Sequence, residues 1–143
     1  MEQKALLTGP EVFELLPQRP PMTMVDTLYE AGQQFAETRL TILKDNVFCL
    51  DGHLIEPGIV EHSAQSAAAF AGYKYYLCGE KPRVGLIGEI KDFHIRRLPV
   101  VGEEIRTRVT ILGEAFGMSL VETVSTAGGE EIAGGRIKIF IQE

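Results

Sequence analysis

The chain has 143 residues, of which 45% are hydrophobic and 24% charged, and these values are ordinary for one globular domain with its own core. Its formal net charge of −6 argues against nucleic acid as a general partner, because binding to phosphates needs a basic surface. No apolar run is long enough to span a bilayer and the N-terminus lacks the pattern of a signal peptide, so we expect a cytoplasmic protein without membrane contact. Two cysteines in separate segments form neither a disulfide framework nor a metal-ligand set, and we expect no metal and no cofactor.

The first predicted element is a short helix that begins near Thr8 and ends before Pro17. Thr8 and Glu11 have the spacing of a capping box, in which each side chain pairs with a backbone N–H of the other residue. Two strands are predicted next, over residues 22–31 and 34–43, joined by a turn at Gly32. The second strand alternates in character from residue to residue, which is typical of a sheet with one buried face.

The central stretch holds the best helix of the chain. Residues 47–50 have strand character, and the helix is predicted from about Glu56 or Pro57 to Leu77. Proline is tolerated in the first helical turn, and the Cys-Gly pair after Leu77 supplies a stop. Alanine is abundant and charge is nearly absent between residues 63 and 73, whereas an outer helix would show one polar face. We therefore expect a central helix with other elements packed close against it.

Four strands are predicted after this helix. The first covers residues 84–97, where Gly85 and Gly88 indicate bulges or a close backbone approach. Residues 104–112, 116–125 and 131–141 follow as an antiparallel meander with hairpin connections. This order favours an α+β architecture in which one antiparallel sheet curls around a single apolar helix. The last strand is a candidate for burial or for pairing with a second copy of the chain.

His53, Glu61 and His62 place two imidazoles and a carboxylate beside the N-terminus of the central helix. Such a set suits general acid–base chemistry next to free backbone N–H groups. Other interpretations of each residue remain open. His53 could be a surface residue in a turn, Glu61 could serve the positive end of the helix dipole, and His62 could be exposed near the helix start.

Four stretches match, in order, the motifs of one enzyme family. Residues 16–26 (LPQRPPMTMVD) are similar to L-P-H-R-x-P-x-L-L-V-D, and residues 46–53 (NVFCLDGH) to N-E-x-F-F-x-G-H. Residues 57–65 (PGIVEHSAQ) are similar to the helix start P-G-V-x-x-x-E-x-x-A-Q, and residues 93–103 (FHIRRLPVVGE) to F-x-R-P-V-x-P-G-D. The sequence therefore resembles the beta-hydroxyacyl-[acyl carrier protein] dehydratases of the hotdog fold.

The resemblance implies a single hotdog domain over residues 1–143, with an antiparallel sheet wrapped around a long central helix. It implies a homodimer, or a larger assembly of dimers, with two sheets joined edge to edge and active sites at the interface. His53 would be the catalytic base and Glu61 the catalytic acid, one from each subunit, while the N–H of Gly58 would bind the thioester carbonyl. The reaction would convert a 3-hydroxyacyl thioester on acyl carrier protein to the trans-2-enoyl thioester, in fatty-acid, polyene or polyketide-type synthesis.

The chain departs from the family motif at several positions. The loop between His53 and Glu61 is several residues shorter, and Gln18 stands where the family has histidine. The short loop is similar to that of dehydratase-like proteins of polyene pigment assembly. With this loop shortened, His62 of the following helix could substitute for one of the two catalytic groups. Two alternatives of the same fold stay open: an acyl-thioester hydrolase and a non-catalytic dehydratase-like subunit.

An acyl carrier protein is acidic, so a net-negative enzyme needs a local basic patch to dock it. The candidates are Lys91, Arg96 and Arg97, with Lys81 and Arg83 before them. Alternating charges on the solvent face of a strand are also common without any docking role.

Overall fold

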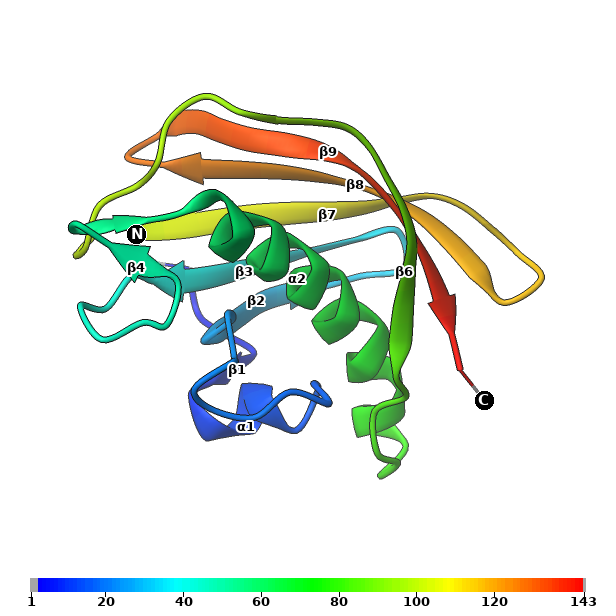
Figure 1. Ribbon diagram of the computed structural model, residues 1–143. Helices are drawn as coiled ribbons and strands as arrows, with labels where there is room; N and C mark the ends of the chain where they lie inside the picture. The colour runs from blue at the N-terminus through cyan, green and yellow to red at the C-terminus, as the bar shows by residue number, and fades with distance from the viewer. Residues whose placement is uncertain (1–2, 143) are drawn as a thin grey trace.

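A computed structural model describes residues 3–142 and shows one curved antiparallel sheet around a long helix (Figure 1). The helix is α2 (Glu56–Leu77), and a short α1 (Pro10–Phe13) precedes the second strand. The sheet has the strand order β1-β2-β3-β7-β8-β9-β6, and β4 and β5 form a separate pair. The strands are β1 (Leu7–Thr8), β2 (Thr27–Ala31), β3 (Phe35–Thr41), β4 (Cys49–Leu50), β5 (His53–Leu54), β6 (Gly85–Ile95), β7 (Glu104–Ala115), β8 (Met118–Ala127) and β9 (Glu130–Ile141).

The central helix has the predicted bounds. Pro57 lies in its first turn, and the chain leaves it through Cys78 and Gly79, whose φ of 72° is the left-handed conformation that glycine adopts without strain. Gly72 shows how close the neighbours are, because a Cβ added there would lie 2.2 Å from the Leu15 carbonyl oxygen. Small residues on α2 therefore let other segments approach its backbone, as expected for a central helix.

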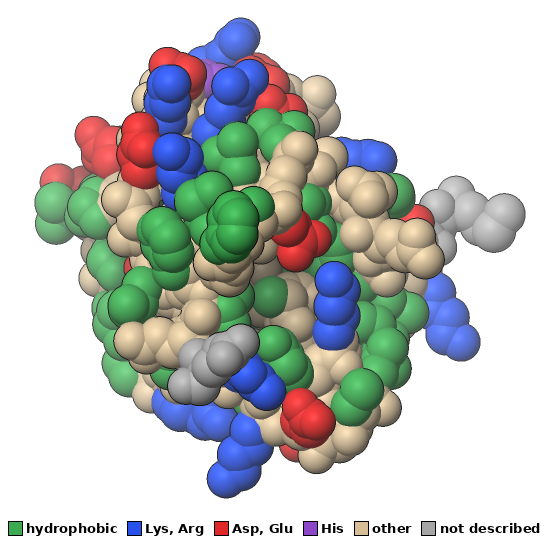
Figure 2. Space-filling view, turned by 90° about the vertical axis from the view of Figure 1, so that its right-hand side faces the viewer, with side chains coloured by type: hydrophobic (Ala, Val, Ile, Leu, Met, Phe, Trp, Pro, Cys, Tyr) green, Lys and Arg blue, Asp and Glu red, His purple; other side chains and the backbone are tan. Residues whose placement is uncertain are grey.

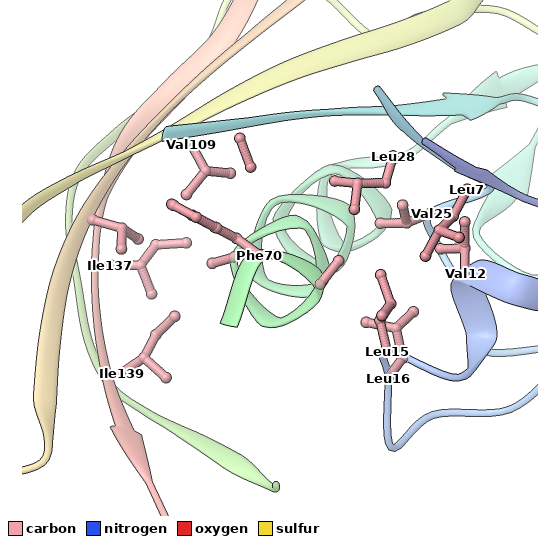
Figure 3. Packing of buried hydrophobic residues seen from close by; sticks show 14 residues of the cluster. Leu7, Val12, Leu15, Leu16, Val25, Leu28, Phe70, Val109, Ile137 and Ile139 are labelled. Carbon is pink, nitrogen blue, oxygen red and sulfur yellow. The ribbon is translucent and has the colours of Figure 1, made fainter. Parts of the chain in front are cut away.

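Apolar side chains fill the space on both sides of α2 (Figure 3). Phe70 points from the helix toward Val109 and Ile137 on the sheet, and all three are buried. On the other side, Leu15 and Leu16 from the segment after α1 are wholly buried. Each large side chain removed from water contributes roughly 1.5–3 kcal/mol, so this core holds helix, sheet and N-terminal segment together.

The N-terminal prediction is wrong in its details. Leu7 and Thr8 form β1, which pairs with β2 through Leu7 and Leu28, so Thr8 cannot cap a helix. The helix is only the four residues of α1, and its N-cap is Gly9, with no side-chain cap from the described residues. Pairing with a distant strand thus overrides the local capping signal. The strand predicted from residue 22 begins only at Thr27, after the extended segment that follows two prolines.

The C-terminal half matches the predicted meander, but β7 continues past its predicted end at residue 112 to Ala115, and the turn lies at Phe116 and Gly117. β8 begins and ends two residues later than predicted. The two edges of the sheet are β1 and β6. The last strand, β9, is not an edge, because it lies between β8 and β6. Burial of β9 is confirmed by Ile137 and Ile139.

The β6 edge carries exposed apolar side chains at Leu86, Ile87 and Ile90. Its register shifts between Ile87 and Glu89, which confirms the bulge predicted at Gly88. None of the helices in residues 3–142 is long and apolar enough to cross a membrane.

Candidate active site

A cavity of about 360 Å³ lies between α2 and the strands of the curved sheet. The helix contributes small side chains to it, such as Ala64, Ala68 and Ala71, and the sheet contributes Ile87 and Ile139. Alanines at these positions leave room that larger residues would fill. The face of the molecule turned to the viewer in Figure 2 is hollowed, with hydrophobic side chains visible inside and charged side chains around it.

Glu61 lines this cavity from the second turn of α2. Its Oε1 accepts a hydrogen bond of 2.8 Å from Nε2 of Gln65, one helical turn further on. The Gln65 side chain is buried, and its Oε1 accepts a 2.6 Å hydrogen bond from the N–H of Met24. The carboxylate predicted to be catalytic is therefore held in one orientation at the wall of an apolar cavity.

His53 lies at the start of β5, directly after a tight turn. Asp51 and Gly52 have φ values of 52° and 77°, the pattern of a two-residue hairpin turn, for which Asp-Gly is a favoured sequence. The imidazole is exposed, with Nδ1 3.0 Å from the Asp51 carbonyl oxygen. A carbonyl can only accept, so this contact assigns the proton to Nδ1 and leaves the lone pair of Nε2 available as a base.

One copy of the chain does not bring the two predicted catalytic groups together. Glu61 is part of the cavity wall, whereas His53 is absent from the set of described residues that line the cavity. That a second chain presents His53 to the cavity of the first stays a prediction.

Gly58 is buried at the start of α2, and its N–H donates a 2.9 Å hydrogen bond to the Ile55 carbonyl. A Cβ on this residue would lie 2.6 Å from the Cβ of Phe48 and 2.9 Å from a methyl carbon of Leu54. Close packing thus accounts for glycine here. The contact of its N–H with a thioester carbonyl stays a prediction, since it would compete with the bond to Ile55.

His62 is wholly buried, so the interpretation as an exposed residue is wrong. Its Nδ1 lies 2.6 Å from the Met24 carbonyl oxygen and its Nε2 lies 2.7 Å from Oγ1 of Thr107 on β7. Desolvation lowers the pKa of His62, against smaller opposing effects of the Met24 carbonyl and the Asp26 charge. The ring faces the sheet and is not among the described side chains at the cavity, so it does not replace either predicted catalytic group within this chain.

The side chains of two glutamines at the cavity have positions and hydrogen-bond contacts that the sequence alone did not indicate. Gln65 orients Glu61, although the sequence showed it only as one letter of a motif. Gln18, noted as a departure from the motif, lines the same cavity, and its Oε1 is buried with no hydrogen-bond partner in residues 3–142. A buried acceptor without a donor is uncommon in folded proteins and suits a ligand that brings an N–H or O–H group.

The three docking candidates differ in how their charges are used. Arg97 pairs with Glu103 at 2.9 Å and with Glu130 at 3.0 Å, and these hydrogen bonds raise the pKa of Arg97 and lower that of Glu103. Arg96 is more exposed, with one contact of 3.2 Å to Glu131, and Lys91 is exposed on β6. Arg96 and Lys91 therefore present more charge to a partner than Arg97 does.

Two further cations, Lys74 and Arg83, line the cavity together with Tyr75, and the Arg83 guanidinium lies 4.9 Å from the centre of the Tyr75 ring. Within residues 3–142 no group of three or more His, Cys, Asp or Glu side chains is arranged to hold a metal ion.

A family model described as ApeP-like, ApeP dehydratase, matches residues 10–143. The chain belongs to the ApeP-like dehydratase family. This ApeP-like chain is also 26% identical over 141 residues to the 3-hydroxyacyl-[acyl-carrier-protein] dehydratase FabZ of Clostridium acetobutylicum, a match that covers 92% of the chain and 95% of the relative. The predicted kinship with hotdog dehydratases is confirmed.

Solved structures confirm the hotdog fold of this ApeP-like dehydratase. The dehydratase heterocomplex ApeI:P from Xenorhabdus doucetiae superposes with a TM-score of 0.84 at 17% identity, covering 92% of this chain and 91% of that one. A hypothetical thioesterase protein with coenzyme A from Streptococcus pneumoniae superposes with a TM-score of 0.65 at 5% identity, covering 80% and 84%. Identities this low show the shared fold and leave the reaction to be argued from the site.

Proposed function

We propose that this ApeP-like dehydratase removes water from a 3-hydroxyacyl thioester carried by acyl carrier protein and releases the trans-2-enoyl thioester. The observation that carries the proposal is the Glu61 carboxyl group, fixed by Gln65 at the wall of an apolar cavity. An apolar cavity suits an acyl chain, and a positioned carboxyl group suits proton transfer to a leaving hydroxyl. The relative FabZ, 26% identical, carries the name of the same reaction.

The two predicted catalytic groups can complete the reaction without any other reactant. Nε2 of His53 takes the proton from C2 of the acyl chain, and the electrons of that C–H bond form the C2–C3 double bond. The C3–O bond breaks, and the hydroxyl leaves as water with a proton from Glu61. Exchange of protons with solvent then returns the imidazole to its neutral form and Glu61 to its protonated form.

We infer that the working unit is a dimer joined at β6. This strand is one of the two edges of the sheet, the other being the two-residue β1, and Leu86, Ile87 and Ile90 expose apolar surface along it. Ile87 also lines the cavity, so a second chain at this edge would lie beside the site. Such a dimer offers a way for His53 of one chain to approach Glu61 of the other, which supports the assignment of one catalytic group to each subunit.

A thioester hydrolase is the second candidate, because a carboxylate in a cavity without an imidazole can activate water. The likeness to a hypothetical thioesterase protein fits this candidate at the level of the fold alone. The third interpretation, a non-catalytic subunit that needs a related partner, draws on the heterocomplex ApeI:P of Xenorhabdus doucetiae.

Mass spectrometry of carrier-bound substrates separates these functions. The purified chain is incubated with 3-hydroxyacyl and with saturated acyl thioesters of acyl carrier protein. Loss of one water from the hydroxyacyl substrate supports the dehydratase, and release of free carrier thiol from both substrates supports the hydrolase. No product from the chain alone, with dehydration after addition of a related dehydratase subunit, would support the non-catalytic subunit and contradict the proposal.

A further inference from the structure

Next to Glu61 on α2, and outside the set of described residues that line the cavity, lies the only ionisable side chain in residues 3–142 that is wholly buried. This is His62, and both of its ring nitrogens have partners, Met24 through Nδ1 and Thr107 through Nε2. The mechanism proposed above does not use this histidine. A buried polar group that is fully bonded fixes the groups around it, because breaking one of its bonds leaves a buried donor or acceptor without a partner.

The chemistry of the partners sets the direction of each hydrogen bond. The Met24 carbonyl can only accept, so Nδ1 of His62 carries the proton at that contact. In the neutral ring Nε2 then accepts from the Thr107 hydroxyl, and the Thr107 oxygen in turn accepts from Ser125 Oγ at 2.6 Å. The imidazole is thereby anchored to the middle of the sheet, on β7 and β8.

Met24 is held through two successive peptide units, one on each side of its Cα. Its carbonyl accepts from His62 at 2.6 Å, and its N–H donates to Oε1 of Gln65, also at 2.6 Å. Met24 is buried and lies in the extended segment before β2, outside the strand ladders of the sheet. Two side chains of α2 therefore supply, for this segment, the hydrogen bonds that a neighbouring strand would otherwise supply.

Gln65 connects the N–H of Met24 to the cavity. Its Nε2 has two protons, and it donates one to the Met22 carbonyl at 2.8 Å and one to Glu61 Oε1 at 2.8 Å. Rotating the amide by a half turn would set its NH₂ group against the N–H of Met24, so only one orientation satisfies all the contacts. A hydrogen-bond chain thus runs from Ser125 and Thr107 through His62, Met24 and Gln65 to Glu61.

We propose that His62 is a positioning residue for the Glu61 carboxyl group, acting through the backbone of Met24 and the Gln65 amide. The kinetic part of this inference rests on the proposed dehydratase function, whereas the geometric part does not. When the carbonyl of Met24 loses its donor, the backbone on both sides of the Met24 Cα is free to turn. The N–H of Met24 then shifts, and Gln65 loses the bond that aims its Nε2 at Glu61. The carboxyl group then spends less time in the position that reaches the substrate hydroxyl.

Two substitutions of His62 separate the two ends of its ring. In His62→Asn the side-chain NH₂ can occupy the place of Nδ1 and still donate to Met24, while the contact with Thr107 is lost. In His62→Gln the longer amide reaches toward Thr107 and leaves the Met24 carbonyl without its donor. The variants are thus a matched pair that removes one bond each, and thermal melting with circular dichroism checks that both fold.

The expected kinetic result is a difference between the two variants in kcat and not in KM. His62→Asn keeps kcat within about threefold of the parent chain, whereas His62→Gln lowers it by about ten- to a hundredfold with KM changed by less than about twofold. Thr107→Val, which removes only the far contact, behaves like His62→Asn. Equal loss in His62→Asn and His62→Gln, or a loss confined to KM, overturns the proposal.

Nitrogen-15 NMR tests the geometry even if the chain dehydrates nothing and even if His62→Gln fails to fold. In the parent chain the neutral His62 ring should carry its proton on Nδ1, and the Gln65 side-chain NH₂ should give two well-separated, slowly exchanging signals. His62→Asn should keep the Gln65 signals. A proton on Nε2 in the parent chain, or Gln65 signals lost in His62→Asn, would overturn the positioning role whatever the reaction proves to be.

Discussion

The two faces of α2 differ in what the fold leaves free. On the face toward β7 and the Met24 segment, His62 is wholly buried and both ring nitrogens are bonded. On the face toward the cavity, Glu61 has one oxygen on Gln65 and its other oxygen without a hydrogen bond from residues 3–142. We therefore expect these neighbours in sequence to differ in function: the saturated group should stabilise and orient, and the group with a free acceptor site should be available for chemistry.

The largest effect is expected at the cavity face. Glu61→Gln keeps an oxygen that can accept from Gln65 but loses the proton that the leaving hydroxyl needs, so we expect dehydration to fall more than about a hundredfold, or about 2.7 kcal/mol in activation free energy. His53→Ala should show a loss of the same order. Both are measured as the initial rate of enoyl formation by the parent chain and the variants.

Glu56→Gln is the matched control, since Glu56 is an exposed glutamate in the first turn of the same helix. Its rate should stay within about twofold of the parent chain. A Glu61→Gln variant that turns over as fast as this control would remove Glu61 from the mechanism.

Stability should respond most on the packed side of α2. In Gly72→Ala the added Cβ would meet the Leu15 backbone oxygen at 2.2 Å, and backbone cannot move aside as a flexible side chain does, so the free energy of unfolding should drop by roughly 1–3 kcal/mol. Chemical denaturation measures the change.

The matched substitution Gly113→Ala adds a methyl group where no described atom lies within 4 Å, and it should change stability by less than about 0.5 kcal/mol. On the hollow side, Ala68→Val points into the cavity and should leave the fold intact while reducing kcat/KM for long acyl chains more than for short ones. Equal destabilisation by Gly72→Ala and Gly113→Ala would contradict the close packing described at Gly72.

A smaller effect is expected when pH is lowered. Because burial lowers the pKa of His62 below its usual value of 6.5, the unfolded chain binds a proton that the folded chain does not. The contribution of His62 to stability is therefore complete above pH 6.5 and is lost as pH falls toward the folded-state pKa, with a slope of up to about 1.4 kcal/mol per pH unit.

The measurement for this prediction is urea unfolding of the parent chain and His62→Asn between pH 7.5 and about pH 5, a range set by the titration of histidine. The variant keeps the exposed His53 and His94 and should show a shallower decline. Parallel curves for the two chains would contradict the assignment of this decline to His62.

The smallest effect is expected on the outer surface, at the carrier-docking candidates. Arg96→Glu should raise KM for a carrier-bound substrate by a few-fold, and added salt should weaken binding by the parent chain in the same way. Arg97→Glu should instead lower stability, because Arg97 forms ion pairs with Glu103 and Glu130 of the same chain. A KM that neither substitution nor salt changes would place the docking surface elsewhere.

Local signals in the sequence were sufficient for the long helix and the meander. Proline in the first turn, alanines along the helix and a Cys-Gly stop predicted the bounds of α2 to within about one residue, and motifs on either side predicted the hotdog fold. The pairing of Leu7 with Leu28 and the position of β6 at the edge were missed, because both depend on contacts between residues far apart in the chain.

The two faces of α2 could not be told apart from the sequence. Small residues lie on most of the circumference of α2, so no apolar stripe in the sequence indicates which side of the helix packs closely and which side lines the cavity. The motif pointed to Glu61. The burial of the His62 side chain and its hydrogen bonds to Met24 and Thr107 arise only when the sheet is in place. Gln65 and Gln18 were hidden for the same reason, since an amide shows its function only through its partners.

The central claim is a site built from Glu61 of one chain and His53 of another, and a mixing experiment tests it directly. His53→Ala and Glu61→Gln, each inactive alone, are unfolded together, refolded and assayed for enoyl formation. Random pairing puts one intact site in half of the dimers, so activity should return to about a quarter of that of the parent chain treated in the same way. A mixture as inactive as either variant alone, with mixed dimers confirmed by native mass spectrometry, would contradict a site shared between chains.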